Sequence, residues 1–239
     1  MTSLLIDDVL AIDAGSLTSS LSFEEQKKLS AVLLTHCHYD HVRDIAAVAI
    51  NFSHFQKTLG IFAVANTLDA ISNHILNGTI YPRFNEIPTP DRPPVEFHPL
   101  QTHNALNIAG YGVLGVPVKH TVTTVGYQVS YGKGSFFYSG DTGPGLASCW
   151  AYISPQLLIT DMTLPDRLKE HALSSEHLTP SSLAEELREI KKVSGDLPRV
   201  VLIHLSPVFE DEIRAEVEVM AKDLKADITL GYEGMVINL

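Results

Sequence analysis

Three histidines and one aspartate lie within six consecutive positions, at His36, His38, Asp40 and His41. They directly follow the apolar run of residues 31–34, which is typical of a buried strand, and α/β folds place their chemistry at the carboxyl ends of strands. In an extended backbone the side chains of residues i and i+2 point the same way, so His36 and His38 can bind one ion. Asp40 and His41 come after the turn and can reach a second ion. Imidazole and carboxylate groups at this spacing predict a metal site.

Chance clustering of surface histidines after a strand is the alternative, and the ligand spacing disfavours it. Cys37 occupies the alternate position of the extended segment and should point away from its two histidine neighbours, which favours a small buried thiol over a ligand. Asp40 also suits the N-cap of a helix, because the apolar spacing of residues 42–49 predicts that a helix follows.

Three further candidate ligands, His120, Asp141 and His204, each follow a strand-like apolar run. A carboxylate such as Asp141 can bridge two cations, and each histidine can complete the ligands of one ion. Taken singly, each has an ordinary alternative: a histidine satisfied by its neighbours near a strand end, or an aspartate that caps the following glycine turn.

The composition is ordinary for a globular protein, with 239 residues, 45% hydrophobic and 19% charged. The even distribution of apolar residues predicts a single domain over residues 1–239. The net charge of −11 should repel polyanions, which disfavours long nucleic acids as substrates, whereas local cations could still hold a small anion.

Neither a signal-like N-terminal segment nor an apolar run long enough to cross a membrane is found, so we expect a soluble protein without membrane partners. Two cysteines are too few for a disulfide framework, and one of them lies inside the histidine motif. A reducing, cytoplasmic location is the simplest expectation. The sequence leaves the oligomeric state open, with a homodimer among the alternatives.

Short apolar runs alternate with helix-like segments along the whole chain. The predicted strands are residues 4–6, 9–12, 31–34, 61–64, 111–118, 125–131, 135–138, 157–159, 200–203 and 228–230. The predicted helices are residues 40–52, 66–76, 180–193 and 210–224. Two β-rich layers covered by helices are the architecture that this order favours.

Residues 79–99 contain six prolines and cannot form a regular helix. A linker between domains is one interpretation. The apolar anchors Ile80, Tyr81, Phe84 and Ile87 favour the other, a loop packed over a sheet edge or over the rim of the active site.

The order of the candidate ligands resembles that of the metallo-β-lactamase superfamily, whose His-x-His-x-Asp-His signature corresponds to residues 36–41 and is followed by a distant His, Asp and His. Within the superfamily the chain is most similar to the class II 3′,5′-cyclic-nucleotide phosphodiesterases. This similarity lies in Leu4–Asp7, Ile12–Gly15, Leu34–His41, Asn77–Pro82, Ser139–Pro144 and His177–Pro180. The resemblance spans most of the chain and implies an α/β fold in which two β-sheets flanked by helices form an αββα sandwich.

The resemblance also implies two divalent metal ions, zinc in the first place, with manganese or iron as alternatives for such a ligand set. The implied ligands are His36, His38 and His120 for one ion, Asp40, His41 and His204 for the other, and Asp141 between them. Asp13 is expected to support the ligand loop by contacting a histidine.

The implied catalytic residues are Asp40, His177 and Asp161. Paired with Asp161, the His177 ring would protonate the leaving oxygen. Asp161 stands where related phosphodiesterases and ribonucleases Z more often carry glutamate. A histidine that merely precedes a helix is the alternative for His177.

The implied activity is hydrolysis of a small phosphodiester, a 3′,5′-cyclic nucleotide such as cAMP or cGMP, to the 5′-monophosphate. A ribonuclease Z-like RNA phosphodiesterase is the first alternative, and the absence of a basic arm counts against it. A thioester or lactam hydrolase is the second. A metal-binding or sensor domain without turnover is the non-enzymatic alternative, and the complete ligand set counts against it.

Overall fold

The computed structural model describes residues 1–89 and 91–239 and divides the chain into two compact units, Met1–Gln101 and Thr102–Leu239. Each unit has its own β-sheet and its own buried apolar core. The single hydrolase domain over residues 1–239 stays a prediction.

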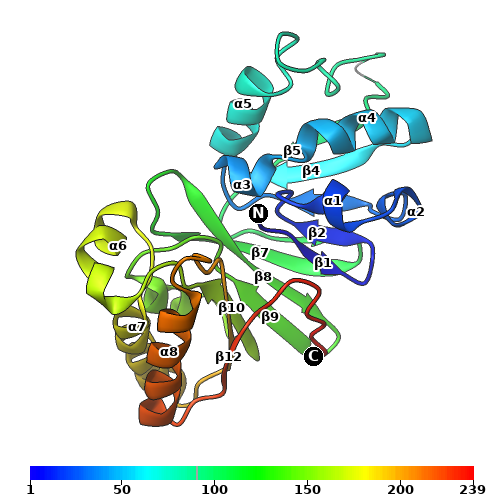
Figure 1. Cartoon of the computed structure of the whole chain (residues 1–239). Coiled ribbons are helices and arrows are strands. Elements are labelled where there is room, and N and C mark those ends of the chain that lie inside the picture. The colour runs from blue at the N-terminus through cyan, green and yellow to red at the C-terminus, as the bar shows by residue number, and fades with distance from the viewer. Residues whose placement is uncertain (90) are drawn as a thin grey trace. The chain divides into compact units, whose positions relative to one another are not determined.

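The first unit is built on a five-stranded sheet in the order β1-β2-β3-β4-β5 (Figure 1). Only β1 and β2 pair antiparallel, and the other neighbours are parallel. Its strands are β1 (Leu4–Ile6), β2 (Leu10–Ile12), β3 (Ala31–Leu33), β4 (Leu59–Ala63) and β5 (Val95–Pro99). Its helices are α1 (Leu17–Ser20), α2 (Phe23–Gln26), α3 (Tyr39–Val42), α4 (Ile45–Phe55) and α5 (Ala65–His74).

The central strands β2 and β3 are buried along their whole length. This agrees with their continuous apolar sequences, because a parallel strand covered on both faces needs no polar alternation. Helix α4 buries Ile45, Val48 and Phe52 in the same core. The carboxyl end of β3 is therefore held rigidly where the histidine motif begins.

The predicted helix over residues 40–52 is interrupted in the structure, and its predicted N-cap at Asp40 is wrong. The chain forms two helices here, α3 with His38 at its N-cap and α4 with Asp44 at its N-cap. Asp40 lies in the first turn of α3. The break occurs because the Asp44 backbone N–H donates to the Ala14 carbonyl, while its carboxylate accepts from the Thr18 backbone N–H at 2.7 Å and the Thr18 hydroxyl at 2.8 Å.

The second unit is built on a seven-stranded sheet in the order β12-β11-β10-β9-β8-β7-β6. Strands β6 to β9 pair antiparallel, and β9 to β12 pair parallel. The strands are β6 (Ala105–Ile108), β7 (Tyr111–Val118), β8 (Thr124–Tyr131), β9 (Gly134–Tyr138), β10 (Leu157–Asp161), β11 (Arg199–Ile203) and β12 (Ile228–Leu230). The helices are η1 (Leu146–Ala151), η2 (Asp166–Leu168), α6 (Lys169–Ser175), α7 (Pro180–Ser194) and α8 (Glu210–Leu224).

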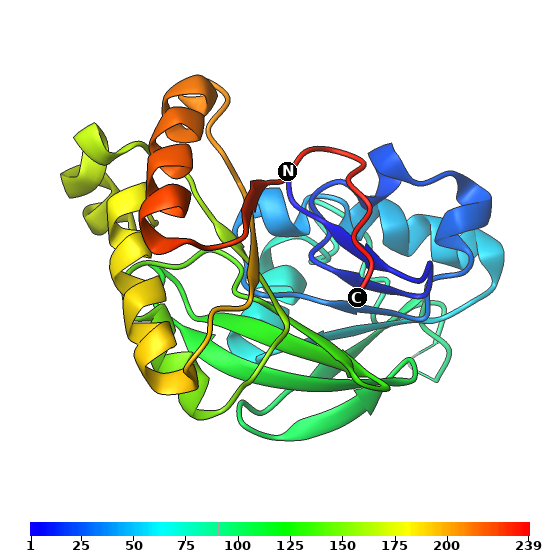
Figure 2. The same cartoon turned by 90° about the horizontal axis from the view of Figure 1, so that it is seen from below.

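Helices α7 and α8 run side by side along this unit (Figure 2). The sequence specifies both ends of α7. Thr179 and Ser182 form a capping box, Pro180 occupies the first turn, and Gly195 ends the helix with a φ of 86°. The capping box fixes the start of α7 immediately after His177.

All ten predicted strands are present, with ends that agree to within two residues. Strands β5 and β6 are not among the predicted runs. The prolines of residues 79–99 predict a loop, yet residues 95–99 form strand β5. This strand lies at the edge of its sheet, where a proline is tolerated. The loop prediction is thus wrong for residues 95–99, and Pro90 lies outside the described residues.

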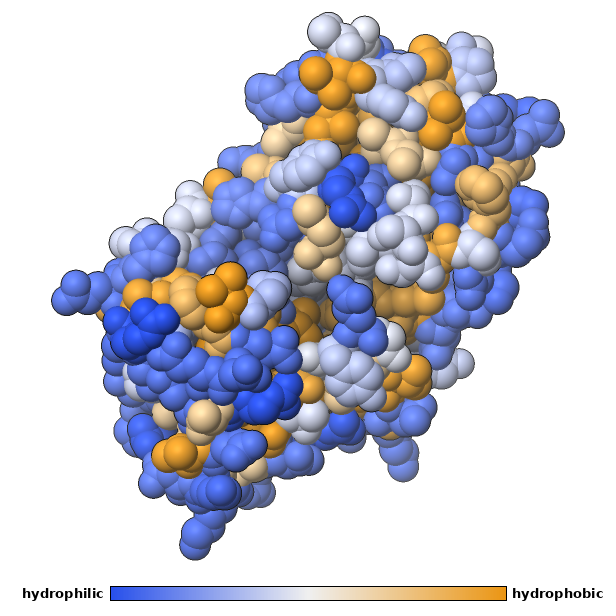
Figure 3. All heavy atoms as spheres, viewed as in Figure 1, coloured by the Kyte–Doolittle hydropathy of each residue, from blue (hydrophilic) through white to orange (hydrophobic). Residues whose placement is uncertain are grey.

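Hydrophilic residues cover most of the face drawn in Figure 3, with apolar residues in small separate groups. Of the helices formed by residues 1–89 and 91–239, none combines the length and the apolar character needed to cross a membrane.

Candidate metal centre

In the first unit, the histidine motif leaves the carboxyl end of β3 and enters α3. The rings of His36 and His38 lie 4.7 Å apart, centroid to centroid, and those of His36 and His41 lie 4.2 Å apart. His36 and His41 are completely buried, whereas the side chain of Asp40 is about one-third exposed. His41 Nε2 lies 3.5 Å from Asp40 Oδ2. The rings of His36 and His38 thus lie on the same side of the extended segment, close to each other, as the sequence predicts.

Asp13 anchors this group from the end of β2. Its Oδ2 lies 2.7 Å from His41 Nδ1, and its Oδ1 accepts from the Thr35 backbone N–H at 2.8 Å. The Thr35 hydroxyl lies 3.0 Å from both carboxylate oxygens and 2.9 Å from His36 Nδ1. Because the Nδ1 atoms of both rings face these partners, Nε2 is the candidate ligand atom of each. Asp13 therefore has the supporting contact that the sequence predicts, and Thr35 adds a second one.

The backbone of this region is tightly constrained. Asp13 has a φ of 61°, in the left-handed region that costs most residues energy but suits aspartate better than most. The Ala14 backbone N–H donates to the His41 carbonyl, and the Thr2 backbone N–H donates to the Asp40 carbonyl. At Gly15, a Cβ atom would lie 1.8 Å from the Asp40 carbonyl oxygen. Only glycine allows the two segments to approach so closely.

Changing Gly15 to alanine should destabilise the protein and weaken metal binding. The added methyl group meets backbone atoms of Asp40 and Thr2, which no side-chain rotation can move away. We expect a loss of about 1–3 kcal/mol in the free energy of unfolding, as for other overpacked sites. Urea unfolding and zinc competition with a chromophoric chelator measure the two effects.

Gly112→Ala is the matched control, because a Cβ at Gly112 would meet Ser130 only at an ordinary 3.8 Å. It should keep the wild-type zinc affinity. A Gly15→Ala protein that unfolds and binds zinc like the wild type would contradict the positioning role of the close approach.

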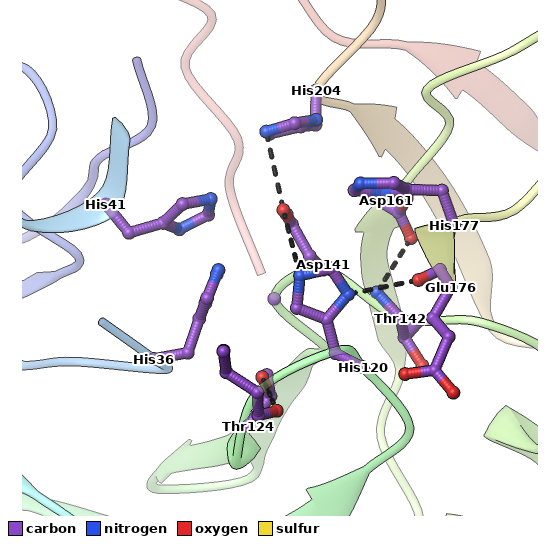
Figure 4. A network of polar contacts seen from close by, with 12 residues as sticks. His36, His41, His120, Thr124, Asp141, Thr142, Asp161, Glu176, His177 and His204 are labelled. Carbon is purple, nitrogen blue, oxygen red and sulfur yellow. Dashed lines mark hydrogen bonds and ion pairs between the residues drawn. The ribbon is translucent and has the colours of Figure 1, made fainter. Parts of the chain in front are cut away.

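The second unit brings His120, Asp141 and His204 together at strand ends, as the sequence predicts (Figure 4). Asp141 Oδ2 lies 3.9 Å from His120 Nε2 and 3.6 Å from His204 Nε2. The side chains of His120 and Asp141 are almost completely buried, and that of His204 is 20% exposed. One carboxylate oxygen of Asp141 thus lies between two imidazole nitrogens, and each of the two separations is one that a cation could span.

His120 and His204 are each held by a further contact. His120 Nδ1 lies 3.1 Å from the Glu176 carbonyl oxygen, which directs Nε2 toward Asp141 (Figure 4). Glu176 and His204 both have left-handed backbones, with φ values of 54° and 62°. Strained residues of this kind cluster at functional sites. Glu176 could not be predicted from the sequence, because a backbone carbonyl acceptor carries no signal in its side chain.

The predicted pair of Asp161 and His177 is present beside these ligands. His177 Nδ1 lies 3.0 Å from Asp161 Oδ2, and Asp161 is buried at the end of β10. The His177 ring lies 5.1 Å from the His120 ring and stacks at 5.7 Å on the His204 ring. Burial acts to lower the pKa of His177, but the hydrogen bond and charge of Asp161 outweigh it and raise this pKa. The pair therefore favours a protonated imidazole.

The two free cysteines are not alike. Cys37 is only partly buried, where the sequence predicts a buried thiol. Cys149 is buried against the Pro117 carbonyl, and burial raises the pKa of its thiol to about 12. Neither belongs to the groups of side chains in the described residues that could ligate a metal.

The donor set of each unit fits a divalent metal ion. In each of four pairs of side chains, the two ligand atoms lie within 4.8 Å of each other. The pairs are His36 and His38, Asp40 and His41, His120 and Asp141, and Asp141 and His204. Imidazole nitrogens and carboxylate oxygens are the ligands that Zn²⁺, Mn²⁺ and Fe²⁺ accept. A histidine that binds metal through one ring nitrogen usually has a hydrogen-bond partner at the other. The Nδ1 atoms of four rings have such partners, those of His36, His41, His120 and His204.

Residues 2–205 match the family described as "Beta-lactamase superfamily domain". Because the match covers most of the chain, including every candidate ligand, the protein belongs to this family.

Two proteins of known name are similar in sequence. The "Probable 3′,5′-cyclic-nucleotide phosphodiesterase" of Yersinia pestis is 24% identical over 211 residues, which cover 77% of this chain and 59% of that protein. The "Ribonuclease Z" of Mycobacterium marinum is 29% identical over 126 residues, which cover 48% of this chain and 45% of that protein. The matches thus span less than two thirds of either relative.

Two solved structures are similar in fold. Unliganded yeast PDE1 has a TM-score of 0.79 at 19% identity, over 89% of this chain and 69% of that one. The metallo-β-lactamase fold protein YhfI of Bacillus subtilis has a TM-score of 0.74 at 20% identity, over 98% of this chain and 88% of that one. The predicted fold class, a metallo-β-lactamase-like arrangement of two β-sheets flanked by helices, is confirmed.

Proposed function

We propose that this protein is a dinuclear metal-dependent phosphodiesterase that hydrolyses a 3′,5′-cyclic nucleotide, such as cAMP or cGMP, to the 5′-monophosphate. The observation that carries the proposal is the Asp161–His177 pair, whose imidazole lies beside the rings of His120 and His204. Hydrolysis of an alkyl phosphodiester needs a proton donor for its leaving oxygen. A thioester has no such need, because its thiolate leaving group departs without a proton.

The proposed ligands are those that the sequence predicts. His36, His38 and His120 would hold one ion, Asp40, His41 and His204 the other, and Asp141 would serve both. Bound divalent cations would supply positive charge to the phosphodiester and acidify a water molecule. This local charge explains how a chain with a net charge of −11 could bind an anion.

The chain's own residues would orient the reaction and move the proton. Because His177 Nδ1 faces the Asp161 carboxylate, Nε2 is the atom that would donate its proton to the departing 3′-oxygen. Asp161 would hold the ring in this orientation and stabilise its protonated form. Asp40, partly exposed at the start of α3, would bind metal and help to orient the attacking water.

An RNA phosphodiesterase of the ribonuclease Z type is the second candidate, and the similarity to the Mycobacterium marinum protein favours it. The net charge of −11 favours the cyclic nucleotide instead. Zinc as the metal and a cytoplasmic location belong to the proposal as its more specific expectations.

The test is a hydrolysis screen of the metal-loaded protein with chromatography of the products. Its substrates are cAMP, cGMP, an aryl phosphodiester, a thioester, a lactam and precursor tRNA. Release of the 5′-monophosphate from a cyclic nucleotide is the expected result. Efficient cleavage of precursor tRNA or of the thioester, without turnover of any cyclic nucleotide, would refute the proposed substrate class and leave the metal site standing.

A further inference from the structure

The hydroxyl of Thr163 lies among three groups of the proposed site. Its Oγ1 atom lies 3.1 Å from Asp161 Oδ2, 3.2 Å from His177 Nδ1 and 3.1 Å from His204 Nδ1. Thr163 follows β10 by two residues and is partly buried. Its carbonyl accepts from the Ser206 backbone N–H, which ties it to the segment that carries His204.

The chemistry of these groups assigns the protons. A carboxylate only accepts hydrogen bonds, and a hydroxyl has a single proton to donate. The Thr163 hydroxyl therefore donates to Asp161, and its oxygen must accept from the N–H at His204 Nδ1. In the neutral His204 ring this leaves the lone pair on Nε2, the atom that faces Asp141 Oδ2 at 3.6 Å. His177 Nδ1 donates to the same Asp161 carboxylate.

The same arrangement occurs in the first unit. There the Thr35 hydroxyl lies 3.0 Å from both oxygens of Asp13 and 2.9 Å from His36 Nδ1. Asp13 also bonds a second histidine, His41, just as Asp161 bonds His177. In each unit, one carboxylate holds one histidine directly and a second one through a threonine hydroxyl. Two independent occurrences favour a positioning role over chance packing.

We propose that Thr163 is a positioning residue that fixes His204 with Nε2 as its metal-binding atom and joins it to the Asp161–His177 pair. This inference rests on the proposed function in one respect only, which is that His204 binds metal. It does not depend on which substrate is hydrolysed. The contacts of the hydroxyl with both histidines mean that its removal should affect metal binding and proton donation together.

The test compares Thr163→Val, which removes the hydroxyl, with Thr163→Ser, which keeps it. Zinc affinity is measured by competition with a chromophoric chelator. Thr163→Val should weaken the binding of one zinc equivalent by about 10–100-fold, the usual effect of losing a partner behind a ligand. Thr163→Ser should restore it. Thr58→Val is the control, because it removes a hydroxyl that donates to the Pro93 carbonyl in the other unit.

A second measurement needs no variant of Thr163. Nitrogen NMR of the zinc-loaded protein should show the proton of His204 on Nδ1, with the signal assigned by its absence in a His204→Gln spectrum. A proton on Nε2 overturns the inference, even if Thr163→Val does not fold.

Two outcomes separate this inference from the proposed function. Unchanged zinc affinity in Thr163→Val, beside a wild type that binds two zinc ions, overturns the inference alone. A wild type that binds no zinc overturns both.

Discussion

Replacing His177 with alanine should leave the metal content unchanged and lower kcat on a cyclic nucleotide by about 10²–10⁴-fold, the usual contribution of a general acid. The ring contacts Asp161 and stacks on His204, and it is only 15% exposed. Steady-state kinetics together with elemental analysis of the purified variant measure both quantities. Removing a proton donor should affect the turnover of bound substrate more than its binding.

An activated aryl phosphodiester distinguishes proton donation from a structural role. Its leaving group needs no proton, so His177→Ala should slow it much less than it slows the cyclic nucleotide. His171→Ala is the matched control, since it removes an exposed imidazole from the neighbouring helix α6. Equal losses on both substrates, or loss of metal from the His177 variant, would make this residue structural.

The double variant His36→Ala/His38→Ala should lose at least one metal ion per chain and reduce hydrolysis to the background rate. Both imidazoles come from the end of β3, and their ring centroids lie only 4.7 Å apart, so they are proposed to share one ion. Removing two of its ligands leaves too few to hold it. Elemental analysis after dialysis against a weak chelator gives the number of ions retained.

His54→Ala/His74→Ala is the control for the loss of two imidazoles, because both of these side chains are exposed on helices of the same unit. It should retain full metal content. Circular dichroism establishes that the double ligand variant is folded. A folded His36→Ala/His38→Ala protein with undiminished metal content would remove His36 and His38 from the metal assignment.

The strands were predictable because buried parallel strands such as β3, β10 and β11 are short continuous apolar runs. The candidate ligands were predictable because His36, His120, Asp141 and His204 each come within three residues of the end of a strand-like apolar run. Edge strand β5 was not, because it contains Pro99 and directly follows Pro93 and Pro94, a pattern typical of a loop. The break between α3 and α4 was also hidden, since it depends on contacts of Asp44 with Ala14 and Thr18.

The groups that hold the ligating histidines by hydrogen bonds were predictable only in part. Asp13 precedes the histidine motif within a recognisable segment, and its role as a support for a histidine follows from its position. Thr163 and the Glu176 carbonyl gave no such signal. Their importance depends on where the chain places them relative to His204 and His120, which are distant in sequence.

The long connection between α5 and β5 can vary in sequence without any change to the proposed metal ligands. It contains none of the proposed ligands and organises its own first turn, in which Asn77 Oδ1 accepts from the backbone N–H groups of Thr79 and Ile80. Ile80 is 69% exposed. Because the proposed ligands lie at strand ends, the sequence of this segment could differ between relatives while the ligands stay the same. Such modularity would let one hydrolytic scaffold diversify by acquiring new loops while its metal chemistry was inherited unchanged.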